Sequence, residues 1–247
     1  IPIKVARFSE GDGTFNSDNE YLTIINTAAV KRMDLLEYYD SRKNILDIER
    51  NTLFLLADEL NRFKKEKGLK DFNDLLEDFI IKFDSDKPTN KFEVLFIDEA
   101  QDLSLLQWDM VRKIWSRAEK TYIAGDDDQA IFKWAGADVD HFIALKEEVD
   151  DIKTLDQSYR IPGGPIHDLS QKIIGKVQNR FEKEYKPRDE IGILKRYSDI
   201  TQVDMSEGNW LVLSSANYFL DDAKDLCELQ GWYYQYKGRN SIPLKLL

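Results

Sequence analysis

The chain has 247 residues and a formal net charge of −11; 42% of its residues are hydrophobic and 33% are charged. This length allows one large domain or two small ones, and the composition is ordinary for a globular protein. The acidic balance excludes a protein that coats nucleic acid non-specifically, so any DNA contact must come from a local basic or aromatic groove.

The single cysteine, Cys227, excludes an internal disulfide and suits a reducing cytosol. No apolar run is long enough to cross a membrane, so we expect a cytoplasmic protein without membrane contact. The first residues carry neither a start methionine nor the pattern of a signal peptide, which predicts a fragment or a processed chain.

Residues 1–68 are mostly helical in pattern, because 20–40 and 45–68 place apolar residues at three- and four-residue steps. Gly68 follows a lysine-rich turn and is a typical helix end. Residues 71–83 predict a further helix. Composition predicts two loops, at residues 9–19 and 84–90.

The pattern changes after this helical region. Short apolar runs predict strands at 92–97, 120–125, 151–155, 192–197, 209–215 and 232–237. Helical patterns are found at 103–118, 138–149, 162–181 and 218–231. Alternation of strand and helix at this spacing predicts a parallel α/β sheet, in which 92–97 is a fully buried strand. A domain joint is expected between residues 147 and 160.

Two acidic clusters follow neighbouring strands. Asp98 and Glu99 end the first strand, and residues 125–129 follow the second. Ligands of parallel sheets bind beyond the carboxyl ends of the strands, so both clusters should face one crevice. Such a pair fits a nucleotide site in which the aspartate holds Mg²⁺ and the glutamate polarises the attacking water. The alternative is that Asp98 or Asp102 only caps the helix that begins near Leu103.

Further residues around these clusters carry a family resemblance. The segments VLFIDEAQD (94–102), GDDDQAIFKWAGAD (125–138) and LDQSYRIPGGPI (155–166) resemble motifs II, III and IV of the UvrD/Rep-type superfamily 1 DNA helicases. Residues 71–76 are similar to the helix ahead of motif II, and 209–241 to the later part of the second RecA-like domain.

The resemblance implies a fold and a domain division. The expected class is α/β, with incomplete tandem RecA-like parallel-sheet domains and an N-terminal helical accessory region. Residues 1–68 would be the helical accessory (1B-like) region, 69–150 the remainder of the first RecA-like domain, and 151–247 the beginning of the second.

The resemblance also assigns roles at the nucleotide. Asp98 resembles the Mg²⁺ ligand and Glu99 the general base. Gln101, with Asp102, completes motif II and links the nucleotide site to its neighbours. Gln129 resembles the glutamine that senses the γ-phosphate, although it can also be a polar residue at a helix N-terminus. Asp126 is expected to shape its loop rather than to touch metal.

Motif III also implies a DNA contact. Phe132 and Trp134 are placed as the family's base-stacking aromatics, which grip single strands without reading their sequence. The alternative is that both are ordinary core residues. Ala135 stands where several relatives carry Arg, which removes one DNA contact, and Lys133 is expected to supply part of a phosphate contact instead.

Motif IV implies the other side of the nucleotide site. Tyr159 resembles the aromatic that stacks on adenine. Arg160 resembles the arginine finger, a role for which an always charged, forked guanidinium is suited; the alternative is a surface arginine. His141 and His167 match neither a metal-ligand spacing nor a family motif, and we interpret both as structural.

The chain departs from the family in lacking a G-x-x-x-x-G-K-[ST] sequence and motifs V and VI. It is therefore expected to be an internal part of a helicase that hydrolyses Mg-ATP and moves on single-stranded DNA and duplex junctions, 3′→5′ by family resemblance. By itself it is expected to be inactive. The alternative is a non-catalytic single-stranded-DNA-binding or interaction module derived from a helicase.

Overall fold

The computed structural model describes residues 19–44, 48–83, 91–236 and 239–241. The predicted loop at 84–90 and most of the one at 9–19 lie outside these residues. The chain divides into two compact units: unit 1 comprises Ile1–Gln157 and Gln171–Lys186, and unit 2 comprises Ser158–Ser170 and Pro187–Leu247. The chain therefore leaves unit 1 after Gln157, returns at Gln171 and leaves again after Lys186.

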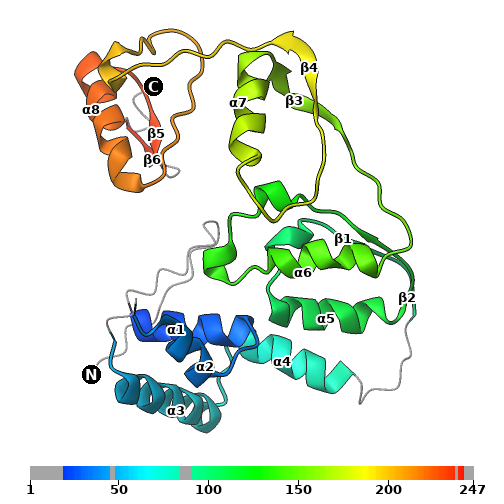
Figure 1. Cartoon of the computed structure of the whole chain (residues 1–247). Coiled ribbons are helices and arrows are strands. Elements are labelled where there is room, and N and C mark those ends of the chain that lie inside the picture. Colours follow the sequence, from blue (N-terminus) through cyan, green and yellow to red (C-terminus); the bar gives the residue numbers. More distant parts are fainter. Residues whose placement is uncertain (1–18, 45–47, 84–90, 237–238, 242–247) are drawn as a thin grey trace. The chain divides into compact units, whose positions relative to one another are not determined.

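The first part of unit 1 is helical, as the sequence predicts. Its helices are α1 (Glu20–Val30), α2 (Leu35–Arg42), α3 (Arg50–Lys67) and α4 (Phe72–Phe83). Ile24, Ala28, Tyr38 and Leu53 form a buried apolar core between the first three helices (Figure 1). Gly68 ends α3 in the left-handed conformation, with φ of 63°, and this confirms the predicted helix end.

The pattern at 20–40 is broken into two helices rather than one. Arg32 has φ of 56°, which no α-helix accommodates. The Asp34 side chain then accepts hydrogen bonds from the backbone N–H groups of Leu36 and Glu37, at 2.8 and 3.3 Å, and so starts α2. The backbone turn at Arg32 therefore separates the two helices, and the Asp34 N-cap begins the second one.

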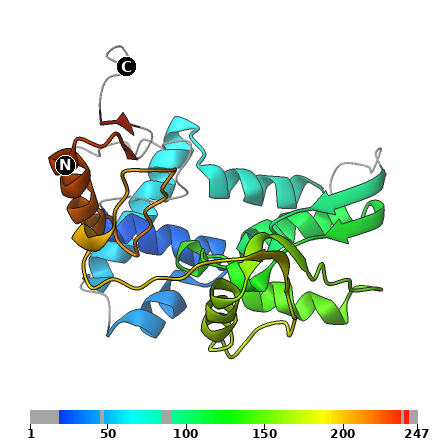
Figure 2. The same cartoon turned by 90° about the horizontal axis from the view of Figure 1, so that it is seen from above.

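The second part of unit 1 has the expected α/β order. It contains β1 (Phe92–Ile97), α5 (Leu105–Trp115), β2 (Ala118–Ile123) and α6 (Val139–Ala144). β1 and β2 pair in parallel, with Val94 opposite Lys120 and Ile97 opposite Ile123 (Figure 2). The α/β class is thereby confirmed. Three short 3-10 helices lie in the connections: Ala100–Asp102, Asp127–Gln129 and Lys133–Ala135.

The prediction that 92–97 is a fully buried strand is wrong. Ile97 and Ile123 pack against the core around Trp108, whereas Phe96 is 74% exposed on the opposite face. There it stacks on Tyr122 with ring centroids 5.2 Å apart. Within the part of the chain that the structure describes, this sheet has two strands. Its outer face has no covering layer there, whereas a parallel sheet is normally covered on both faces.

The remaining elements belong wholly or mainly to unit 2. They are β3 (Gln157–Gly163), α7 (Pro165–Ile174), β4 (Lys186–Ile191), α8 (Asp221–Gln230), β5 (Gln235–Tyr236) and β6 (Arg239–Asn240), with short 3-10 helices at Ile200–Gln202 and Asn217–Leu220. β3 pairs with β4, and β5 with β6. The helices predicted at 162–181 and 218–231 are present in shorter form.

Three predicted strands, at 151–155, 192–197 and 209–215, are wrong. Their apolar residues, among them Leu155, Ile193 and Leu211, are exposed. A strand needs a continuous run of backbone hydrogen bonds to a neighbour, and among the described residues these segments belong to no sheet, although the Gly192 N–H donates to the Gly163 carbonyl at 3.0 Å. None of the described helices is both long and apolar enough to span a membrane.

Candidate nucleotide and DNA site

The carboxyl end of β1 places Asp98 and Glu99 at the surface of unit 1. Glu99 has φ of 51° and ψ of 40°, a left-handed conformation that is uncommon for a residue with a side chain. Its backbone N–H donates to Asp98 Oδ1 at 2.9 Å, and the Ala100 N–H donates to the Ala124 carbonyl at 3.0 Å. The backbone thus turns sharply away from the sheet, and both carboxylates stay exposed.

Gln101 joins this turn to the next acidic loop. Its side chain is 1% exposed. Its Nε2 donates to Glu99 Oε2 at 2.8 Å, while its Oε1 accepts the backbone N–H of Asp126 at 2.9 Å. One buried amide therefore uses both of its ends to connect the Glu99 carboxylate to the loop after β2. This connection joins the two acidic loops, and the role expected of Gln101 at a nucleotide site stays a prediction.

Gly125 is required by this close approach. A Cβ atom at Gly125 would lie 2.8 Å from Gln101 Oε1 and 2.7 Å from Phe142 Cζ. Both distances are shorter than real contacts, so any side chain here would push Gln101 away from Asp126.

Asp126 organises the loop that carries Gln129. Its Oδ1 accepts the Asp128 N–H at 3.2 Å, which starts the 3-10 helix Asp127–Gln129. Its Oδ2 accepts Gln129 Nε2 at 2.5 Å. Asp126 therefore shapes the loop, as the sequence indicates, and holds the exposed Gln129 side chain. The role of Gln129 at a γ-phosphate stays a prediction.

Three residues that sequence reasoning missed complete this loop. Lys183 Nζ lies 2.8 Å from Asp126 Oδ1 and 3.4 Å from Asp128 Oδ2, and it also pairs with Asp127. Arg180 forks onto both Asp128 oxygens at 2.8 and 2.6 Å. The Tyr185 hydroxyl donates to Asp126 Oδ2 at 3.0 Å. Three consecutive aspartates signal a need for cations, but pattern alone does not tell which distant lysine or arginine meets it.

The pKa values of this cluster follow from burial and pairing. Burial by itself raises the pKa of Asp126, but hydrogen bonds from Lys183, Gln129 and Tyr185 bring it below the ordinary aspartate value. Burial and the nearby Asp126 charge raise the pKa of Tyr185 to about 12. Burial lowers the pKa of Lys183, yet its bonds to Asp126 and Asp127 outweigh this and leave it raised. At neutral pH the lysine is charged and the tyrosine is a neutral donor.

Asp102 lies behind the turn rather than at its surface. Its Oδ1 is buried and has no hydrogen-bond partner among the described residues. Burial, and then the charge of Glu99, raise the pKa of the Asp102 carboxyl above its ordinary value. The N-cap of α5 is Ser104, whose side chain makes a capping box with Gln107. The alternative that Asp98 or Asp102 caps this helix is therefore wrong.

Asp98 fits one kind of magnesium site. No cluster of three or more metal-ligating side chains occurs within the described residues, so these residues offer no all-protein cage. A single exposed carboxylate at a strand end suits Mg²⁺, which keeps several waters and takes its remaining oxygens from phosphates.

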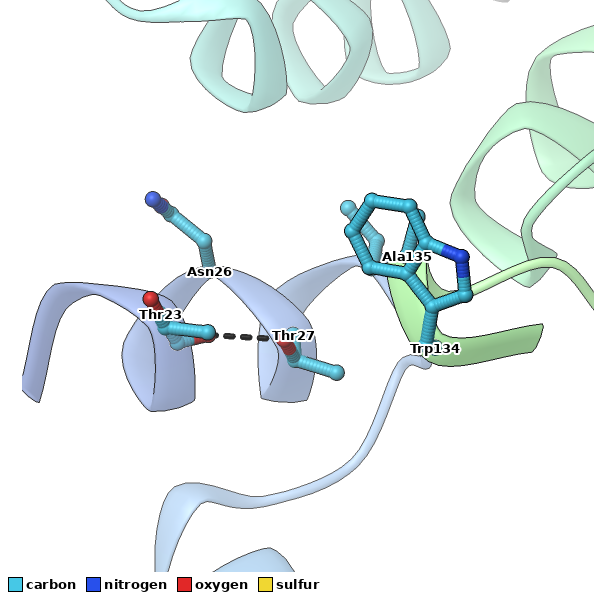
Figure 3. A pocket seen from close by; sticks show the side chains of 6 residues that line it. Thr23, Asn26, Thr27, Trp134 and Ala135 are labelled. Carbon is cyan, nitrogen blue, oxygen red and sulfur yellow. Dashed lines mark hydrogen bonds between the residues drawn. The ribbon is translucent and has the colours of Figure 1, made fainter. Parts of the chain in front are cut away.

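Trp134 lines a small pocket in unit 1. The pocket has a volume of about 90 Å³ and is lined by Thr23, Asn26, Thr27 and Val30 of α1 together with Trp134 and Ala135. Figure 3 shows the Trp134 ring beside the polar side chains of this helix. Gly136 permits this approach, because its φ is 107° and a Cβ atom there would lie 2.4 Å from Val30 Cγ2. Trp134 is 55% exposed.

The neighbours of Trp134 are also accessible. Phe132 is partly buried, with its ring centroid 6.4 Å from that of Trp134 and the planes tilted by 50°. Lys133 is exposed, and its Nζ lies 3.9 Å from Asp140 Oδ2. Trp134 is therefore accessible to solvent, but DNA contact by Phe132, Lys133 and Trp134 stays a prediction.

Tyr159 and Arg160 lie on β3, in unit 2. Both are exposed, Tyr159 to 85%. The Ser158 hydroxyl accepts the N–H groups of Arg160 and Ile161 at 3.3 and 3.0 Å, which fixes the local backbone. Their roles at a nucleotide stay predictions.

The two histidines lie in different surroundings. His141 packs on the Trp108 ring with centroids 5.1 Å apart. Burial and the nearby Arg112 charge lower the pKa of His141. The His167 Nδ1 lies 3.9 Å from the Asp168 carboxylate on α7.

Comparison with known proteins gives one family and several similar helicases. The model of the UvrD/REP helicase N-terminal domain matches residues 11–150. The ATP-dependent DNA helicase Rep of Buchnera aphidicola subsp. Baizongia pistaciae is 27% identical over 206 residues, which cover 76% of this chain and 30% of that protein. The ATP-dependent DNA helicase PcrA of Staphylococcus epidermidis is 28% identical over 156 residues, covering 60% and 21%. That of Bacillus subtilis is 27% identical over 148 residues, covering 57% and 20%. The chain thus spans less than a third of the length of these relatives.

Proposed function

The chain belongs to the UvrD/REP helicase family, and we propose that it is part of an ATP-dependent DNA helicase that couples Mg-ATP hydrolysis to 3′→5′ movement on single-stranded DNA. The observation that carries the proposal is the hydrogen-bonded path from Glu99 through Gln101 to Asp126 and Gln129. A merely structural pair of acidic turns has no need of a buried amide that joins one carboxylate to the neighbouring loop.

Each residue of the path has a role in this chemistry. Asp98 holds Mg²⁺, which when bound neutralises charge on the β- and γ-phosphate oxygens. Glu99 accepts a proton from the attacking water, and Gln101 orients its carboxylate. Gln129 donates to the γ-phosphate. The family resemblance gives Arg160 the role of supplying positive charge as charge develops at the γ-phosphate, and Tyr159 that of stacking on the base.

The DNA track lies at Trp134 in this proposal. An exposed indole binds any base by stacking, and this grip is independent of sequence. Lys133 contributes charge toward a phosphate. The loop that carries both residues begins directly after Gln129, so a change at the γ-phosphate has a short covalent route to the DNA grip. Duplex junctions are the expected place of action, and the cytoplasm the expected compartment.

The test uses the whole helicase of which we propose this chain is a part, called the longer protein below, and two matched substitutions. Glu99→Gln should abolish DNA-stimulated ATP hydrolysis while ATP binding stays close to that of the parent, because a general base acts on water rather than on the nucleotide. Glu93→Gln changes an exposed glutamate of β1, the strand that precedes Glu99, and should leave turnover unchanged. Hydrolysis by Glu99→Gln at the parent rate would refute the assigned role and favour a non-catalytic DNA-binding module.

The 247-residue chain alone is expected to bind no ATP measurably. A P-loop surrounds phosphates with backbone N–H groups and a lysine, and this chain contains no such sequence. An acidic turn without that cradle repels the nucleotide. Calorimetry of ATP with this chain and with the longer protein compares the two directly, and hydrolysis by this chain above a Glu99→Gln control would contradict the proposal.

A further inference from the structure

The segment 179–186 holds the acidic loop Asp126–Asp128 by a set of contacts that is mostly buried. The Lys183 side chain is 7% exposed, that of Asp127 is 3% exposed and that of Asp128 is 7% exposed. The Phe181 N–H donates to Asp127 Oδ2 at 2.6 Å. Each of the three carboxylates of Asp126–Asp128 thus forms a hydrogen bond or ion pair with this segment. We name the segment 179–186 the latch.

The latch also reaches the residues of the proposed chemistry. Tyr185 and Gln129 donate to the same oxygen, Asp126 Oδ2, and Lys183 binds the other. The Asp126 N–H in turn holds Gln101, and Gln101 holds Glu99. Fixing the Asp126 carboxylate therefore fixes the direction of the Gln129 amide and, through one further residue, of the Glu99 carboxylate.

The place of the latch in the chain gives it a second property. Residues Gln171–Lys186 belong to unit 1, but the chain on both sides of them belongs to unit 2. Lys183 and Tyr185 stand directly before the crossing at Lys186–Pro187. The chain enters unit 2 two residues after Tyr185, so the contacts with Asp126 lie close to this crossing, beside the bond of Lys186 with Asp156.

We infer that Lys183 and Tyr185 are positioning residues for the proposed ATP hydrolysis, which hold Gln129 and Glu99 in place and tie the acidic loop to the part of the chain that enters unit 2. This inference rests on the proposed function. It adds residues from outside the three sequence motifs. It also gives the carboxylates of Asp126–Asp128 the role of holding Gln129 and Gln101 in place rather than that of binding a metal ion.

The experiment measures steady-state ATP hydrolysis by the longer protein, with and without single-stranded DNA. Tyr185→Phe removes one hydroxyl and keeps the ring, so it should fold and should lower DNA-stimulated kcat by roughly 2- to 10-fold. Lys183→Met should lower it by roughly 5- to 30-fold, with a smaller change in KM for ATP. Because Lys183→Met leaves Asp127 buried without its cation, the double variant Asp127→Asn/Lys183→Met is made beside it.

Matched controls separate positioning from general damage. Lys176→Met removes an exposed lysine of the Gln171–Lys186 stretch that lies outside the latch, and it should leave kcat and the stimulation by DNA unchanged. Thermal melting of each variant shows whether it is folded. Positioning predicts that folded variants lose DNA stimulation of kcat, which a loss of stability alone does not change.

Two outcomes decide the matter. If folded Tyr185→Phe and the folded lysine variants keep the parent kcat and the parent stimulation by DNA, the inference is overturned, and an unchanged Tyr185→Phe overturns it even where the lysine variants do not fold. Glu99→Gln in the same assay distinguishes this failure from that of the proposed function: if it also keeps its turnover, the proposed function fails first.

Discussion

Replacement of Gln101 by leucine tests the link between the two acidic motifs. The change keeps the volume of a side chain that is 1% exposed but removes its amide. The bond from the Asp126 N–H is lost, which costs about 1 kcal/mol, and a partly buried donor left unpaired adds about 1–3 kcal/mol. The bond to Glu99 adds less, because that carboxylate is exposed. Burial of the more apolar leucine offsets part of the loss, so a net destabilisation of about 2 kcal/mol is expected.

Urea denaturation measures this loss. With a dependence of about 2 kcal/mol per molar urea, the unfolding midpoint should fall by about 1 M. Trp108, Trp115 and Trp134 all lie in unit 1, so tryptophan fluorescence reports on this unit once Trp210 and Trp232 of unit 2 are replaced by phenylalanine. Gln178→Leu changes an exposed glutamine and should shift the midpoint by less than about 0.25 M. Equal, small shifts for both variants would refute the claim that Gln101 bridges the two motifs.

Three further predictions concern DNA, nucleotide and pH. Trp134→Ala in the longer protein should weaken single-strand binding by about 1–3 kcal/mol, measured by fluorescence anisotropy; Trp210→Ala, which removes an equally exposed indole, should not. Arg160→Ala should lower kcat for ATP by about 10³-fold with a smaller effect on ATP binding, and a loss confined to KM in steady-state assays would exclude a finger role. The pKa of Asp126 is lower in the folded state than the ordinary aspartate value of 3.8. The charged carboxylate therefore stabilises the fold at pH values above 3.8, and this stabilisation is lost as the pH falls through the folded-state pKa. The difference in unfolding free energy between the parent and Asp126→Asn should therefore be largest near neutral pH and shrink below about pH 4, measured by urea denaturation across this pH range.

Local signals predicted several elements of the fold. Gly68 ends α3 as predicted, because a helix end of this kind depends on one residue and its immediate neighbours. The helix at 71–83 was found from its periodicity alone. Apolar runs at 192–197 and 209–215 gave wrong strands, because a strand also needs a partner that its own sequence does not supply.

In the candidate site, too, features set by neighbouring residues could be predicted, whereas contacts between distant residues could not. The positions of Asp98 and Glu99 at the end of β1 followed from the alternation of strands and helices. The contacts of Lys183 with Asp126–Asp128 did not, because they join residues more than 50 positions apart. The buried position of Gln101 was likewise invisible, since a polar residue after a strand is ordinarily exposed.

Strand displacement by the longer protein tests the central claim most directly. A duplex with a single-stranded 3′ tail, labelled so that separation releases fluorescence, should be opened in the presence of Mg-ATP by the parent. A 5′-tailed duplex should stay closed, and Glu99→Gln should open neither. Displacement that continues in Glu99→Gln, or a parent that opens neither duplex while still hydrolysing ATP, would contradict the account of this chain as part of a DNA-translocating motor.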